Sequence, residues 1–151
     1  MRKPIQSRSG TIIVRGVLLL ILPTLLSCSL IHYGKTKATA EAGVEQFRRE
    51  FAAGHYHEIY EQADQQFKDA DSESHFAALL AAEQRKLGAV QQSTEVGASL
   101  SASTNNGTAV TLTYDTDFKQ GKGKETFVYR IAGDEAALDG YHIESLALIT
   151  R

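Results

Sequence analysis

Residues 108–118 read TAVTLTYDTDF, and this stretch has the clearest alternation of apolar and polar side chains in the chain. Its first set of alternate positions comprises Val110, Leu112, Tyr114, Thr116 and Phe118. The positions between them are Thr111, Thr113, Asp115 and Asp117. A period of two predicts a β-strand with one face on a core and the other in water.

Turn signals lie on both sides of this strand. Residues 105–107 read Asn-Asn-Gly and residues 121–123 read Gly-Lys-Gly, and both tripeptides suit tight turns. Similar alternation recurs elsewhere, so the predicted strands are residues 90–100, 108–118, 124–131 and 138–149. Short connections between neighbouring strands indicate an antiparallel meander.

The region before the strands has a helical period. Ala40, Val44, Phe47 and Phe51 recur at spacings of four, three and four, which places them on one helix face. Capping and glycine signals predict helices over residues 39–53, 56–67 and 73–87, with Thr39 capping the first. The sequence therefore predicts an α+β fold, with three N-terminal helices packed on a curved antiparallel sheet of about four strands.

The N-terminus has the parts of a secretory signal peptide. Residues 1–15 carry four positive charges and no negative charge, and residues 17–26 read VLLLILPTLL. Ser27 and Cys28 follow this apolar run. We expect a signal peptide over residues 1–27, a tether over 28–37 and one domain over 38–151. An uncleaved signal anchor over residues 11–31 is the alternative, although a charge and a proline interrupt it.

Leu25-Leu26-Ser27-Cys28 resembles the lipobox of bacterial lipoproteins. The resemblance implies cleavage before Cys28, two acyl chains on its thiol and often a third on its amine. Each buried CH₂ contributes about 0.8 kcal/mol, so two or three chains anchor a protein stably. Ser29, where inner-membrane lipoproteins commonly have Asp, implies an outer-membrane lipoprotein facing the periplasm.

Charge restricts the partners of the mature protein. Residues 28–151 have 12 basic and 18 acidic side chains, which gives 12 − 18 = −6 with neutral histidines. A surface of this sign repels phosphates, which argues against nucleic acid and gives no affinity for anionic lipid. Because Cys28 is the single cysteine, an intrachain disulfide and a multi-thiolate zinc site are excluded.

The order of helices and strands is similar to that of the nuclear-transport-factor-two-like, or cystatin-like, superfamily. The residues that carry the resemblance lie between positions 44 and 143: Phe47, Phe51, 54–56, 85–88, 110–118, 125–127 and 140–143. The resemblance implies a cone between helices and sheet that is an open pocket or a filled core. It also implies that such a domain can dimerise.

Three tyrosines fall on the apolar sides of three predicted strands. Tyr114, Tyr129 and Tyr141 could line a pocket with their hydroxyl groups inward, or be core residues with the hydroxyl at the rim. Asp115 and Asp117 share a strand face, as a carboxylate pair for acid–base catalysis would. Their threonine neighbours instead favour a solvated face.

Two further features bear on chemistry. Glu83 lies on the apolar stripe of the third helix, where it could pair with Arg130, cap a pocket or, as we favour, reach solvent. His55 and His57 would point about 200° apart on a helix, and the sequence has no His-x-x-x-His pair. We therefore predict no metal, no cofactor and no catalytic residue.

These observations favour a lipid-anchored envelope protein that is not an enzyme and acts by binding or assembly. Its partners would be the membrane, through the acyl chains on Cys28, and another protein or a second copy of the chain. The alternative is a small-molecule-binding protein, or a weak acid–base lyase or isomerase that uses an Asp or a Tyr in a pocket.

Overall fold

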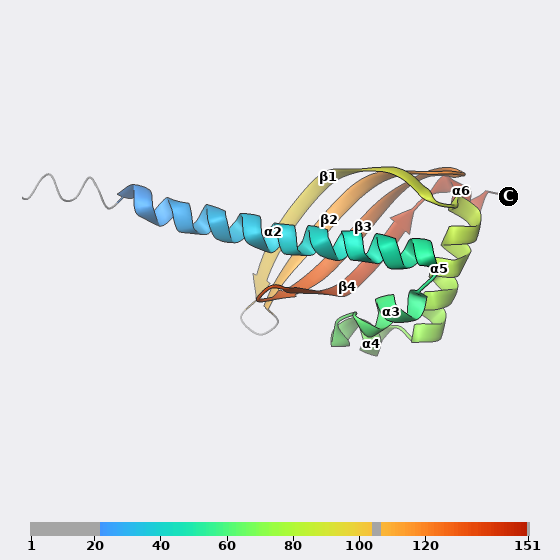
Figure 1. Ribbon diagram of the computed structural model, residues 1–151, viewed down its shortest axis with the longest axis horizontal. Coiled ribbons are helices and arrows are strands. Elements are labelled where there is room, and N and C mark those ends of the chain that lie inside the picture. The colour runs from blue at the N-terminus through green and yellow to red at the C-terminus, as the bar shows by residue number, and fades with distance from the viewer. Residues whose placement is uncertain (1–21, 104–106, 151) are drawn as a thin grey trace, which may run out of the picture. The chain divides into compact units, whose positions relative to one another are not determined.

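The computed structural model describes residues 22–103 and 107–150 of the chain (Figure 1). The chain divides into two units, Met1–Gly34 and Lys35–Arg151, and the sheet belongs to the second. The described helices are α2 (Leu22–Ala53), α3 (Tyr56–Glu61), α4 (Gln65–Ala70), α5 (Glu73–Leu87) and α6 (Leu146–Ile149). Most of the predicted signal peptide, residues 1–21, lies outside the described residues.

The protein has an α+β fold with one open antiparallel sheet. The strands are β1 (Val90–Ser103), β2 (Gly107–Phe118), β3 (Gly121–Ala132) and β4 (Glu135–Glu144). They lie in the order β1-β2-β3-β4, so each strand pairs with the next in the chain. The predicted fold class and four-stranded meander are thereby confirmed.

The core lies between one face of this sheet and the helices. Register places Leu112 opposite Phe127 in β2 and β3, and both side chains are fully buried. Helix α2 contributes Phe47, whose ring centroid lies 5.1 Å from that of Phe127 and 4.8 Å from that of Tyr141. The alternation predicted for residues 108–118 therefore gives the sheet its buried face.

Helix α2 extends further towards the N-terminus than the sequence predicted. Residues 28–37, predicted to be a tether, have helical backbone. Thr39 is not a cap, because its hydroxyl donates to the Lys35 carbonyl 3.1 Å away, one turn earlier in the helix. Lys37 pairs with Glu41 on the next turn and, at 2.8 Å, with Glu95 of β1, which stabilises the added turn.

The second predicted helix is divided in two. Instead of one helix over residues 56–67, the structure has α3 and α4, so four described helices precede the sheet rather than three. The break occurs at Asp64, whose N–H donates to the Leu138 carbonyl at 2.8 Å. The Asp64 carboxylate then accepts from the Gln66 N–H and caps α4. A backbone bond to β4 thus overrides the helical pattern.

The last strand is shorter than predicted. Strand β4 ends at Glu144 rather than near Ile149, and residues Leu146–Ile149 form the short helix α6. Ser145 ends the strand, because its hydroxyl donates to the Lys122 carbonyl at 2.6 Å. Leu146 and Ile149 consequently lie on the surface, where 76% and 79% of their areas are exposed.

Gly43 marks the closest approach of α2 to the sheet. A Cβ at this position would lie 2.7 Å from Cε1 of the buried Tyr129. We expect Gly43→Ala to destabilise the protein, because overpacking costs about 1–3 kcal/mol while helix propensity favours alanine by only about 1 kcal/mol. Urea unfolding measures the change.

Gly34 is the matched control in the same helix. A Cβ at Gly34 would have no neighbour within 4 Å among the described residues beyond the local helix backbone. Gly34→Ala should therefore be neutral or slightly stabilising. An equal gain in stability from both substitutions would contradict the close packing of Gly43 on Tyr129.

Candidate functional site

Polar side chains from all four strands and two helices meet at one end of the core. Thr116 and Glu125 occupy core-facing positions of β2 and β3, where the strand pattern otherwise places apolar residues. Both are buried, as is Glu83 of α5. The remaining members of this buried polar network are Arg48 of α2, Ser93 of β1 and Tyr141 of β4.

Glu125 is the centre of the buried polar network. Its Oε2 lies 2.9 Å from Nη2 of Arg48 and also accepts a hydrogen bond from the Thr116 hydroxyl. The same Arg48 nitrogen donates to the Ser93 hydroxyl at 2.8 Å. Only 3% of the Glu125 side chain is exposed, so its charge is compensated almost entirely by these neighbours.

The Tyr141 hydroxyl joins Glu83 to Glu125. Its oxygen lies 2.7 Å from Oε1 of Glu83 and 3.2 Å from Oε1 of Glu125. One hydroxyl has one proton and can donate to only one of two carboxylates. Both contacts become hydrogen bonds when Glu83 is protonated, because Glu83 then donates to Tyr141 and Tyr141 donates to Glu125.

Burial favours this protonated form of Glu83. Loss of solvent raises the pKa of Glu83 to about 7, although the hydrogen bond from Tyr141 opposes the shift. Its Oε2 is buried without a hydrogen-bond partner among the described residues. The pKa of Tyr141 is raised well above 10, first by burial and then by the two carboxylates, so Tyr141 keeps its proton. Glu83 is therefore a group of the buried polar network that titrates near neutral pH.

The three predicted pocket tyrosines have different surroundings. Tyr129 is buried beside Gly43, where a cavity of about 30 Å³ has room for roughly one water molecule. Tyr114 is half-buried under the Arg48 guanidinium, 5.3 Å from its ring centroid, and burial raises its pKa to about 12. Tyr141 is the one of the three that belongs to the buried polar network.

Asp115 and Asp117 lie on the opposite, solvated face of the sheet. Asp115 pairs with Lys124 at 3.0 Å, and Asp117 pairs with Lys122 at 2.7 Å. Each carboxylate therefore has a lysine partner from the neighbouring strand β3. This arrangement agrees with a solvated sheet face rather than a carboxylate pair.

The sequence pointed to only part of the buried polar network. The prediction that Glu83 reaches solvent is wrong, because the residue is only 1% exposed. Arg130, the other partner considered for Glu83, pairs with Asp139. Arg48 and Glu125 were not predicted at all. Glu125 could have been found, because it alternates with Phe127 and Tyr129 on the apolar side of β3.

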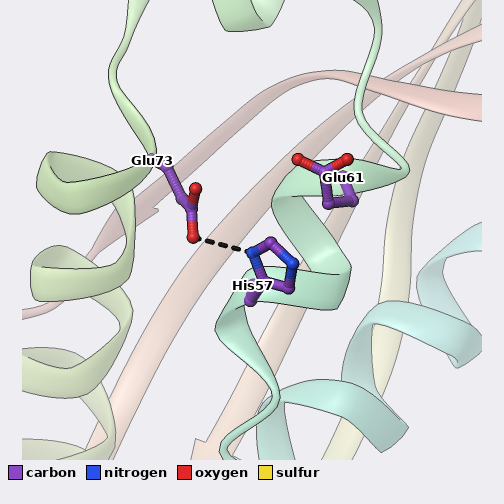
Figure 2. Close-up of side chains that lie close together, drawn as sticks. All are labelled: His57, Glu61 and Glu73. Carbon is purple, nitrogen blue, oxygen red and sulfur yellow. Dashed lines mark hydrogen bonds and ion pairs between the residues drawn. The ribbon is translucent and has the colours of Figure 1, made fainter.

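A second cluster lies on the surface between α3 and α5 (Figure 2). Nδ1 of His57 lies 2.8 Å from Oε1 of Glu73, and Glu61 follows His57 by one helical turn. One ligand atom from each residue lies within 4.8 Å of the others. His55 is not part of this cluster, because it pairs with Glu50 at 3.0 Å.

An open groove runs beside α6. It has a volume of about 1000 Å³ and lies against the turn between β2 and β3. Its lining includes Gly121, Gly123, Ile143, Leu146, Ala147 and Ile149. We refer to this region as the α6 groove. A small-residue turn beside exposed aliphatic side chains gives it a largely apolar surface.

One family model matches the chain. The family is described as "Protein of unknown function (DUF4019)", and the match covers residues 44–141. No curated protein and no solved structure matches the chain significantly. The matched range contains Arg48, Glu83, Glu125 and Tyr141, so the buried polar network lies within it. Since the match spans 98 of 151 residues, the chain belongs to the DUF4019 family of proteins of unknown function.

Proposed function

We propose that the protein is a lipid-anchored lipoprotein of the cell envelope, which acts as a binding or assembly module. Acyl chains on Cys28 would hold it in the outer membrane, with the domain in the periplasm. The observation that carries the proposal is the order of a basic segment, a short apolar run and Leu25-Leu26-Ser27-Cys28.

The position of Cys28 supports a role in attachment. Cys28 precedes Lys35, the first residue of the sheet-containing unit, by seven residues. Thr36 is the first buried side chain among those described. Lipidation at Cys28 would therefore modify the chain ahead of the domain rather than within its core.

A further finding concerns the helices. Within residues 22–103 and 107–150, none is both long enough and apolar enough to cross a membrane.

The α6 groove supports the binding part of the proposal. Leu146 and Ile149 expose most of their surface beside it, and exposed aliphatic side chains around a groove are typical of protein contact sites. We also propose that the domain is nuclear-transport-factor-two-like, because its helices precede a curved antiparallel sheet (Figure 1), which is the order that the resemblance implies.

Glu83 favours a second candidate function, weak acid–base catalysis. A carboxyl group whose pKa is raised to about 7 can act as an acid or a base near neutral pH. Tyr141, at 2.7 Å, would hold the carboxyl group in place by a hydrogen bond. A substrate would have to reach a side chain that is 1% exposed, so this function requires the core to open.

Replacing Cys28 tests the proposed anchor. We expect Cys28→Ser to move the protein from the membrane fraction to the soluble periplasmic fraction or to leave it as uncleaved precursor, because serine cannot form the thioether. Fractionation followed by immunoblotting measures the distribution. Ser27→Ala is the matched control, since it keeps a small residue before the cysteine and should stay in the membrane fraction.

Two outcomes would count against lipidation at Cys28. In the first, Cys28→Ser remains in the membrane fraction as a chain of the same length as the wild type. In the second, the wild-type chain is itself found in the soluble fraction. The first result would favour an uncleaved signal anchor, and the second would favour a protein that is not attached to the membrane.

A further inference from the structure

The surface cluster of His57, Glu61 and Glu73 combines ligand types that bind transition metals. His57 and Glu61 are four residues apart on α3, so their side chains project from the same face. Glu73 begins α5 and approaches them from the other helix (Figure 2). The spacing of His57 and Glu61 is visible in the sequence, whereas Glu73 joins them only through the packing of the two helices.

The distances suit a single ion after small side-chain movements. Zinc binds imidazole nitrogen and carboxylate oxygen at about 2.0–2.2 Å, so tetrahedral ligand atoms lie about 3.3 Å apart. Here the three ligand atoms lie within 4.8 Å of one another, and Nδ1 of His57 and Oε1 of Glu73 are 2.8 Å apart. All three residues are exposed, so their side chains can rotate to close around an ion.

The charges around His57 favour a cation. The hydrogen bond to Glu73 and its negative charge raise the pKa of His57, and Glu61 and Glu58 add to the effect. The same carboxylates would stabilise a divalent ion in place of the proton. Lys68 of α4 is a positive charge near the cluster, and its ammonium group donates to the Glu61 backbone carbonyl at 2.6 Å.

Glu61 is available as a ligand. Its carboxylate has no hydrogen bond or ion pair to another residue in the described part of the chain, although its backbone carbonyl accepts from Lys68. By contrast, the histidine–carboxylate pair His75–Asp71, at 2.6 Å, belongs to no three-residue cluster among the described residues. The two histidines therefore differ in the number of ligands near them: His57 has a second carboxylate beside it, and His75, within the described residues, does not.

We propose that His57, Glu61 and Glu73 bind one divalent transition-metal ion, such as Zn²⁺, between α3 and α5. One imidazole and two carboxylates form a borderline ligand set, which suits zinc rather than the all-oxygen coordination of Ca²⁺ or Mg²⁺. Three protein ligands leave a fourth position for water or for a side chain of a partner.

Titration calorimetry of the full chain, purified in detergent without a histidine tag, tests this site. We expect ZnCl₂ to bind at one ion per chain at pH 7.5 and CaCl₂ to give no binding. His57→Ala and Glu61→Gln should each weaken zinc binding at least about tenfold. Binding should also weaken when the pH falls to 5.5, because a proton then competes for His57.

His75→Ala is the matched control, since it removes an exposed histidine with a carboxylate partner but no third ligand. It should leave the zinc affinity unchanged. Circular dichroism of each variant checks that α3 and α5 remain folded. The proposal is wrong if zinc does not bind, or if folded His57→Ala and Glu61→Gln bind zinc as tightly as the wild type does.

Discussion

Replacing Arg48 with methionine should lower the free energy of unfolding by about 3–5 kcal/mol, because it leaves the buried Glu125 carboxylate without its cation. Only 14% of the Arg48 side chain and 3% of the Glu125 side chain are exposed, and their charged atoms are 2.9 Å apart. Methionine retains much of the contact made by the aliphatic part of the arginine side chain. The lost free energy of unfolding therefore comes mainly from the missing positive charge. Urea unfolding at pH 7 measures it.

Arg49→Met is the matched control for Arg48→Met. Arg49 is the next residue of α2 and is exposed, so its replacement should change stability by less than about 0.5 kcal/mol. In the double variant Arg48→Met/Glu125→Gln, removal of the buried charge should restore a large part of the lost stability. If the stability change of the double variant equals the sum of the changes in Arg48→Met and Glu125→Gln, the two side chains do not stabilise each other.

Glu83 should make the protein less stable as the pH rises from about 4.5 to 7. Burial raises its pKa to about 7 from 4.5, so the folded protein holds a proton that the unfolded chain has lost. In this range the unfolded chain therefore binds fewer protons, and the free energy of unfolding falls as pH increases. The total fall is about 3 kcal/mol, and it is complete above pH 7.

Glu83→Gln isolates this effect. Glutamine has nearly the shape of protonated glutamic acid and can also donate to the Tyr141 oxygen. The free energy of unfolding of the variant should match that of the wild type near pH 4.5 and exceed it at pH 8. The other titrating groups are the same in both proteins, so their contributions cancel in the comparison. Chemical denaturation across this pH range gives both curves. Parallel curves would mean that Glu83 titrates normally and is not buried in solution.

Local patterns predicted those parts of the fold that depend on neighbouring residues. The alternation in residues 108–118 predicted β2 and its buried face, and the spacing of Phe47 and Phe51 predicted the buried face of α2. Both predictions depend only on the repeat of a helix or a strand. The solvated positions of Asp115 and Asp117 followed from the same strand pattern.

The remaining features depend on contacts between segments far apart in the chain. The break at Asp64 is set by a hydrogen bond to Leu138, 74 residues later. Arg48 and Glu125 pair across 77 residues, and Tyr141 meets Glu83 across 58. No local period encodes such pairs. A charged residue within an apolar face, as at Glu83 and Glu125, is the one signal that the sequence offers for them.

The intact mass of the wild-type protein extracted from the membrane fraction tests the proposed anchoring most directly. We predict a chain that begins at Cys28, lacks residues 1–27 and is heavier than the polypeptide by the mass of two or three acyl chains with their glycerol. A chain that retains residues 1–27 and carries no lipid would contradict the account and identify the N-terminus as a signal anchor.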